Sequence, residues 1–373
     1  MSKRTGDFSG NKGEWSEVYV FLKLLADGKL HGADKNGNPI PYEFFKVLKV
    51  KHGTVEALSG TGKIVTFCNS LQSVVENKIT IQKNSKELFD SISNGVGTLP
   101  SHKKGSFLIP NMEVFLRKVG YMQLIVKGTK KRDINVQTDD QTRGQKPYLG
   151  YSIKSEIGGP PTLLNASRAT NIVFLLDGLS QPDVSTINSM YTLQGKTDII
   201  QRCNYIKSKI SLPLNNIRFE KFNNPKFQAN LEGLDDGLPE IITSCVYAHY
   251  FENCKTSEDL ISYLKHTNPR HYSPANLSFY ETKYKRFLRS AALGMKPSFV
   301  WNDEDDATGG YIIAKPNGEL VAFFIYNRKL LDEYLYKRTF FERGSATKHN
   351  FMRAYMLGNQ VYINLNLQIR FKL

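Results

Sequence analysis

The sequence predicts a mixed α/β (α+β) fold with a mixed central sheet flanked by helices, a helical middle region and a β-rich C-terminal part. Short β-prone runs joined by turn residues recur between residues 133 and 177, and helical patterns prevail from 181 to 300. The 373 residues are 40% hydrophobic and 12% aromatic, which is enough for two domains or one large domain with an insertion. We expect three regions: a core region with the first helix and a hairpin at residues 1–180, a mainly helical region at 181–300, and a β-rich C-terminal region at 301–373.

Residues 14–26 predict the first helix, which ends at Asp27-Gly28. Apolar residues lie on most of its faces, so it should be largely buried. Glu14 and Glu17 occupy its first two turns. Acidic side chains there can simply interact favourably with the helix dipole. Alternatively, one of them reaches a metal site. Further along, residues 70–76 also look helical.

Residues 133–154 predict an antiparallel hairpin. A β-prone run begins at Asp133, a polar connection containing Gly and Pro spans 139–147, and a second run carries Ser152 and Lys154. Folding the chain near residue 143 brings Asp133 level with Ser152 and Lys154, which share one strand face. A carboxylate opposite an ammonium in this way can hold a divalent metal and bind a phosphate.

The residues after the hairpin extend the core. Residues 158–161 (GGPP) end the strand, and Thr162 is expected to begin a short helix that runs through Ala169. Residues 172–176 are a compact apolar run typical of a buried strand. The predicted order is therefore strand, hairpin, strand, helix, strand.

The remaining elements follow from helical and alternating patterns. Helices are expected at 183–189, 198–206, 238–249, 257–264, 280–292 and 332–338. Strands are expected at 311–315, 320–326 and 361–370, with a hairpin turn at 316–318. The acidic run at 303–306 is interpreted as a solvated loop, because consecutive acids in a loop point in different directions.

Composition favours a polyanionic partner. Fifty Lys and Arg against 35 Asp and Glu give a net charge of +15 and a pI near 9.4. A basic surface that serves only solubility is the alternative. The four cysteines show no zinc-ligand spacing, and no apolar run is long enough to span a membrane, so we expect free thiols and a cytoplasmic protein.

An Asp on one strand and an acid-x-Lys on the next are the arrangement of the PD-(D/E)XK nuclease core. Beyond this, several blocks resemble the HpaII-type type II restriction endonucleases across almost the whole chain. They are residues 11–17 (NKGEWSE), 21–29 (FLKLLADGK), 149–155 (LGYSIKS), 161–165 (PTLLN), 306–311 (DATGGY), 325–327 (IYN) and 364–371 (NLNLQIRF). One departure from the nuclease pattern is Ser152, which stands where most members carry Asp or Glu.

The resemblance implies Mg²⁺-dependent double-strand cleavage at a short DNA sequence. Asp133, Ser152, Lys154 and Glu17 are the expected catalytic residues. The expected metal ligands are Asp133, the backbone carbonyl of Ile153 and Glu17. Glu156 is the first reserve acid, followed by Asp139 and Asp140.

DNA contacts are expected from basic and amide side chains. The basic run that precedes Asp133 would contact phosphates, and other arginines and Asn165 would contact bases or the backbone. The candidates are Lys130, Lys131, Arg132, Asn165, Arg270, Arg286 and Arg289. The family implies a CCGG-like target, a homodimer on double-stranded DNA and a companion DNA methyltransferase that protects host DNA.

Two other functions stay open from the sequence. A sequence-specific DNA-binding protein on a nuclease scaffold that has lost cleavage would explain Ser152. A basic RNA-binding protein is the third possibility, but no RRM motif with exposed aromatic platforms is present.

Overall fold

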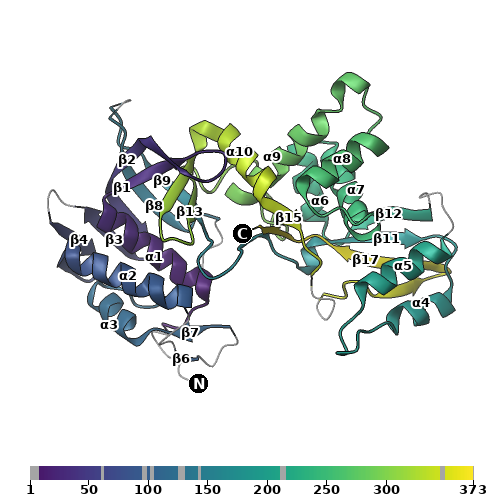
Figure 1. Cartoon of the computed structure of the whole chain (residues 1–373), viewed down its shortest axis with the longest axis horizontal. Coiled ribbons are helices and arrows are strands. Elements are labelled where there is room, and N and C mark those ends of the chain that lie inside the picture. The colour runs from purple at the N-terminus through teal and green to yellow at the C-terminus, as the bar shows by residue number, and fades with distance from the viewer. Residues whose placement is uncertain are drawn as a thin grey trace.

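The computed structural model describes residues 8–59, 63–94, 99–100, 105–124, 131–141, 144–210, 216–344 and 349–372. Helices and strands alternate through two lobes that lie side by side in Figure 1, so the predicted mixed α/β class is confirmed. The described chain ends between the two lobes.

Within these ranges, the largest sheet has nine strands and forms the centre of the first lobe (left in Figure 1). In sheet order they are β1 (Lys29–Ala33), β14 (Leu320–Phe324), β13 (Gly310–Ala314), β9 (Tyr148–Ser155), β8 (Ile134–Asp139), β2 (Pro39–His52), β3 (Val55–Ser59), β4 (Ile64–Cys68) and β5 (Ser73–Asn77). The predicted hairpin, β8–β9, therefore lies in the middle of this sheet. Strand β13 pairs with β9 in parallel, which brings the C-terminal part of the chain to the hairpin.

Helix α1 (Lys12–Asp27) packs on one face of the sheet next to α2 (Lys78–Asn94), and α3 (Pro110–Lys118) lies against α2 (Figure 1). A capping box begins α1: the Asn11 side chain accepts from the Gly13 and Glu14 amides, and Glu14 accepts from the Asn11 amide at 2.7 Å. Gly28, in the left-handed region at φ +66°, ends it. As predicted, the helix is buried on most faces.

Side-chain alternation on β9 and β13 divides the core into two clusters. Tyr151, Ile153 and Ile312 pack toward α1, whereas Tyr311 and Ile313 face the second cluster, formed with helices of the middle region. The central strands are therefore covered on both faces, which explains their continuous apolar character.

The middle region is helical, as predicted. Its helices are α4 (Gln181–Asn188), α5 (Ile199–Lys209), α6 (Pro225–Leu234), α7 (Leu238–Phe251), α8 (Ser257–Thr267) and α9 (Phe279–Leu293), and α10 (Arg328–Arg338) packs against α9. Single 3-10 turns occur at Arg168–Thr170, Pro274–Asn276 and Ile325–Asn327.

Smaller sheets complete the described chain. One has the order β12 (Ile217–Phe222), β11 (Asn171–Leu176), β17 (Gln360–Asn366) and β16 (Ala354–Leu357). Another has the order β10 (Thr162–Leu164), β18 (Ile369–Phe371) and β15 (Thr339–Phe341), and a short pair joins β6 (Leu99–Pro100) to β7 (Phe107–Leu108).

Two local predictions are wrong. Residues 162–164 form strand β10 instead of a helix, because Thr162 pairs with Arg370 and Leu164 with Ile369. Residues 73–77 form strand β5, paired with β4, instead of a helix. The run at 172–176 is a buried strand as predicted, but it belongs to the second sheet, and β13 takes the expected place beside the hairpin.

The division at residues 180 and 300 stays a prediction. Among the described residues, no helix combines the length and apolar character needed to cross a membrane.

Candidate active site

The hairpin aligns the predicted residues as its sequence implies. Ile134 pairs with Tyr151, and the Asp133 amide donates to the Tyr151 carbonyl at 2.8 Å, so Asp133 lies opposite Ser152. On the other side of β9, Ser152 is level with Tyr311 and Lys154 with Ile313. The predicted strand register is thereby confirmed.

Two donors on β9 hold the Asp133 carboxylate. The Ile153 amide donates to Oδ2 at 2.6 Å, and the Ser152 hydroxyl donates to the same oxygen at 3.4 Å. Ser152 is only 1% exposed. A buried neutral hydroxyl that donates to a carboxylate orients that group, which differs from the ligand role of an acid at this position.

Glu17 reaches the same site from α1. Glu17 and Asp133 line one pocket of about 640 Å³, together with Ile153, Lys154 and Asn165. The first turn of α1, the loop that follows β9 and Arg370 line the rest of this pocket. Lys12 at the start of α1 donates to the Gly158 carbonyl at 3.1 Å, which joins the helix to that loop. The helix therefore adds the Glu17 carboxylate to the hairpin, and Glu14 in its first turn lines the same pocket.

The charge of Glu17 opposes the ionisation of Asp133 in this pocket. Burial, and next the negative charge of Glu17, raise the pKa of Asp133 to about 6. Lys154, the hydrogen bond from the Ile153 amide and Lys131 act in the opposite direction and lower it. Burial and then the Lys154 charge lower the pKa of Lys131 to about 7, while Asp133 acts in the opposite direction. A positive ion shared by the two carboxylates would offset their repulsion.

The donor set fits a hard divalent cation. Two carboxylates and a backbone carbonyl are oxygen ligands, and Mg²⁺ is commonly held by one or two carboxylates while it keeps several waters. Across the described ranges, no cluster of three or more His, Cys, Asp or Glu could hold a metal.

The loop before β13 fixes the base of the hairpin, and its role was not predicted. Asp306 accepts from the Lys131 amide at 2.7 Å, and Thr308 accepts from the Gly150 amide at 3.2 Å. The Gly309 amide donates to the Gly150 carbonyl at 2.7 Å. The acidic run at 303–306 is therefore more than a solvated loop, because Asp306 braces the chain two residues before Asp133.

The other acids have structural partners. Glu14 completes the capping box of α1. Glu156 accepts from the Tyr334 hydroxyl at 3.0 Å and pairs with Arg338, so it is held against α10. Asp139 and Asp140 lie at the turn end of the hairpin, away from the pocket.

The expected DNA-contacting residues are dispersed. Lys131 and Arg132 adjoin Asp133, and Arg132 lines a neighbouring cavity of about 340 Å³ with Lys296. Lys130 lies outside the described residues. Arg270 pairs with Glu240 at 3.0 Å, Arg286 with Asp303 at 3.8 Å and Arg289 with Asp332 at 2.5 Å. None of these three arginines lines the hairpin pocket, and their DNA contacts stay a prediction.

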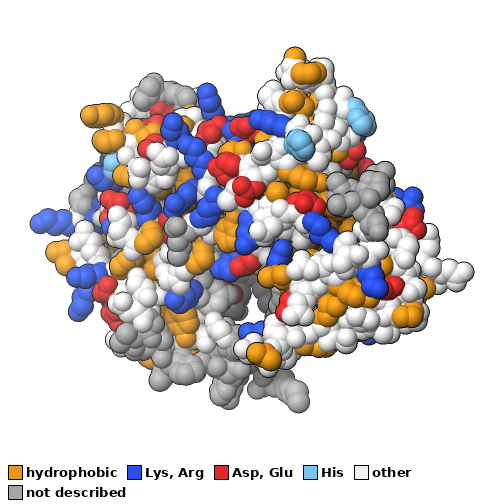
Figure 2. Space-filling model, turned by 45° about the vertical axis from the view of Figure 1, so that its right-hand side comes forward, with side chains coloured by type: hydrophobic (Ala, Val, Ile, Leu, Met, Phe, Trp, Pro, Cys, Tyr) orange, Lys and Arg blue, Asp and Glu red, His pale blue; other side chains and the backbone are white. Residues whose placement is uncertain are grey.

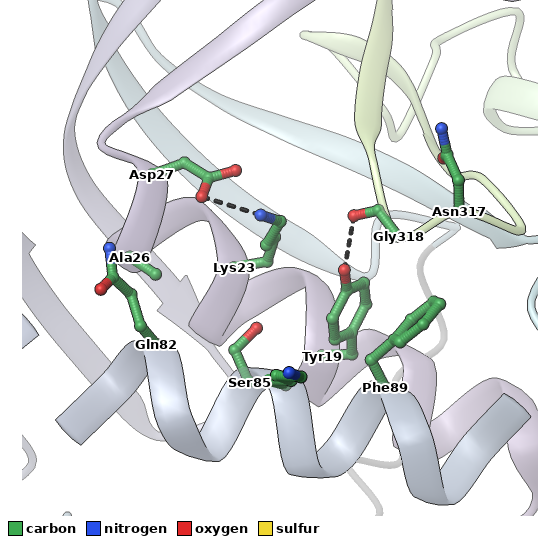
Figure 3. A pocket seen from close by; sticks show the side chains of 10 residues that line it. Tyr19, Lys23, Ala26, Asp27, Gln82, Ser85, Phe89, Asn317 and Gly318 are labelled. Atoms are coloured by element: carbon green, nitrogen blue, oxygen red, sulfur yellow. Dashed lines mark hydrogen bonds and ion pairs between the residues drawn. The ribbon is translucent and has the colours of Figure 1, made fainter. Parts of the chain in front are cut away.

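A different pocket, of about 310 Å³, lies between α1, α2 and the β13–β14 turn (Figure 3). The Tyr19 hydroxyl donates to the Gly318 carbonyl at 2.5 Å, and Lys23 pairs with Asp27 at 2.9 Å. Its central polar groups already bond one another, so it is a weaker candidate than the hairpin pocket.

Basic side chains are widely spread over the surface. Figure 2 shows Lys and Arg over much of one face, with acidic side chains among them. This distribution agrees with the net charge of +15 and suits a polyanion that covers a large area.

Comparison with known proteins shows that almost the whole chain is similar to one family of restriction enzymes. A family model described as the HpaII restriction endonuclease matches residues 11–371. The chain is 35% identical over 371 residues to the type II restriction enzyme HpaII of Haemophilus parainfluenzae, covering 98% of this chain and 99% of that protein. No solved structure matches. The chain belongs to the HpaII restriction endonuclease family.

Proposed function

We propose that this protein is a Mg²⁺-dependent type II restriction endonuclease whose active site is the pocket at the β8–β9 hairpin. The observation that carries the proposal is the convergence of Asp133, Glu17 and Lys154 on one pocket, with Ile153 between them. It is supported by family membership, since restriction enzymes of type II act on double-stranded DNA and generally need a divalent metal. The hairpin with Asp133 and Lys154 also agrees with a PD-(D/E)XK core.

In this proposal Asp133, Glu17 and the Ile153 carbonyl would hold a Mg²⁺ ion, which would supply Lewis-acid stabilisation of negative charge on the scissile phosphate. Ser152 and the Ile153 amide keep the Asp133 carboxylate oriented through its Oδ2 atom. Lys154 holds a phosphate oxygen and orients the attacking water, and Lys131 places a second amino group beside the same carboxylate.

The partners follow from the reaction. A palindromic target requires two cuts on opposite strands, so we propose a two-fold homodimer on the DNA. A CCGG-like target, a companion DNA methyltransferase and a cytoplasmic location belong to the same proposal. Sequence-specific binding without cleavage is the second candidate, and the neutral Ser152 is the observation that favours it.

Unmethylated plasmid DNA distinguishes the two. The protein is incubated with Mg²⁺ or with EDTA, beside Asp133→Ala, Lys154→Ala and the surface control Asp177→Ala. Discrete fragments that need Mg²⁺, persist in the control and disappear in both active-site variants are expected. Intact DNA with tight specific binding by the unchanged protein would identify a binder that does not cleave.

A further inference from the structure

A buried hydrogen-bonded chain lies directly behind Glu17. His52, at the end of β2, is 1% exposed, and its Nε2 lies 3.4 Å from Glu17 Oε2. Its Nδ1 lies 3.0 Å from the Tyr121 hydroxyl, and Tyr121 is 3% exposed. Lys51 pairs with Asn135, so the register sets His52 beside Ile134, the residue after Asp133. This chain is therefore adjacent to both carboxylates of the proposed site.

The chemistry of the three groups fixes the direction of the bonds. A carboxylate only accepts, so Nε2 must carry the hydrogen that lies toward Glu17. In a neutral imidazole Nδ1 then accepts, and the Tyr121 hydroxyl donates to it. Burial, and then the charge of Glu17, raise the pKa of Tyr121 well above its ordinary value, so that its hydroxyl keeps its hydrogen. A doubly protonated ring would also donate from Nε2 to Glu17.

Aromatic packing fixes the plane of the histidine ring. The His52 ring centroid lies 6.1 Å from that of Phe21 and 5.8 Å from that of Tyr121, and those two rings meet edge to face at 5.9 Å. Phe21 follows Glu17 by one turn on α1. The same helix therefore supplies both the carboxylate and an aromatic ring that packs against His52. The histidine cannot easily turn away from Glu17.

We propose that His52 is a positioning residue, held by Tyr121, that orients the Glu17 carboxylate toward the cation shared with Asp133. The inference rests on the proposed function of this pocket. Partners of this kind behind a metal ligand commonly set its orientation, and their loss costs about 10–100-fold in metal affinity or activity. This hydrogen-bonded chain matters more here because Ser152 leaves Asp133 as the one hairpin acid that lines the pocket, and Glu17 then supplies the second charge.

The tautomer is tested first, by ¹⁵N NMR of protein labelled on histidine. The matched internal control is His249, whose Nδ1 lies 2.9 Å from the Cys254 carbonyl and must therefore donate. His52 is expected to carry hydrogen on Nε2, and His249 on Nδ1. A His52 ring with hydrogen on Nδ1 and none on Nε2 would overturn the proposal, because it could not donate to Glu17.

Cation affinity is tested second, by calorimetric titration with Ca²⁺, which takes oxygen ligands as Mg²⁺ does. Tyr121→Phe and His52→Gln are each expected to weaken Ca²⁺ binding by about 10–100-fold. In a Glu17→Gln background the same changes should have little further effect, since they act through Glu17. Tyr247→Phe removes a hydroxyl from the other core cluster and should leave the affinity unchanged.

The outcomes separate this inference from the proposed function. Undiminished Ca²⁺ affinity in both Tyr121→Phe and His52→Gln, or equal losses with and without Glu17, would overturn the positioning role. If the unchanged protein binds no Ca²⁺ at all, the proposed function fails and the positioning role fails with it, even with the expected tautomer. Tyr121→Phe is the conservative change and preserves the aromatic packing.

Discussion

Asp133 combines burial with the repulsion of a second acid, and both are unfavourable for its charged form. Its pKa of about 6 means that the folded protein binds a proton here which the unfolded chain, near the ordinary value of 3.8, has already released. The site therefore lowers folding stability above pH 6, as expected of residues arranged for a ligand that neutralises them. Ser152 avoids adding a third acid beside this pair.

This leads to a stability prediction for Asp133→Asn without divalent cations. The wild type should lose stability as pH rises from about 4 to 6, where its folded form releases the proton, whereas the uncharged variant should not. At pH 8 the variant should be more stable, by roughly 1–3 kcal/mol. Urea unfolding at pH 4 and pH 8 measures the difference. Asp177→Asn, at an exposed carboxylate paired with Arg218, is the control. A variant less stable than wild type at pH 8 would contradict the assignment.

The same titration predicts the acid limb of the activity profile. Protonated Asp133 cannot hold a cation, so cleavage at subsaturating Mg²⁺ should fall as pH decreases through about 6. Higher Mg²⁺ should move this limb to lower pH, because cation and proton compete for one carboxylate. Initial rates across pH at two Mg²⁺ concentrations test this. If the acid limb stays at the same pH at both Mg²⁺ concentrations, it arises from the titration of a group other than Asp133.

At the scale of elements, the entry to β13 joins distant parts of the chain at the hairpin. Gly310 has φ +122°, and a Cβ there would lie 2.0 Å from the Phe323 carbonyl oxygen. At Gly309 a Cβ would meet the Tyr151 ring at 2.4 Å. Only glycines allow this close approach, which positions Asp306 and Thr308 against the hairpin.

Gly310→Ala is therefore expected to destabilise the protein by at least about 2–4 kcal/mol, through backbone strain and the clash with Phe323. Gly233→Ala is the matched control: it lies within α6 and a Cβ there meets no atom within 4 Å. The control should be neutral, or stabilising by about 0.5–1 kcal/mol. Thermal unfolding of both variants measures this. If Gly310→Ala melts at the same temperature as Gly233→Ala and the wild type, the close packing at the entry to β13 is contradicted.

Elements made of neighbouring residues were predictable, and those made by distant pairing were not. The β8–β9 hairpin, its register and α1 follow from local turn chemistry and periodicity. Nothing local in residues 162–164 or 73–77 reveals their strand partners, and nothing near the hairpin indicates that β13 pairs with it. For the same reason the sequence does not indicate the contacts of His52 and Asp306 with the site, whereas the family resemblance implies Glu17.

At the scale of the whole molecule, the net charge of +15 should dominate binding to DNA. Affinity of Asp133→Asn, chosen to keep the DNA intact, should fall by about 10³-fold or more between 50 and 200 mM salt if six or more phosphates are contacted. Arg132→Ala should reduce the slope of log affinity against log salt by about one. Lys221→Ala, on β12 of the other lobe, is the control. An unchanged slope in Arg132→Ala would remove Arg132 from the DNA interface.

The central claim, that Glu17 supplies the second carboxylate of the site, is tested most directly by a Mg²⁺ titration of single-turnover plasmid cleavage. Glu17→Gln is compared with Glu14→Gln, one turn earlier on α1, where glutamine can preserve the capping box. We expect Glu17→Gln to lower cleavage at least about 100-fold and to raise the Mg²⁺ requirement, because it removes a charged ligand. Glu14→Gln should cleave like the wild type. Full activity in Glu17→Gln at the same Mg²⁺ concentration would contradict the account.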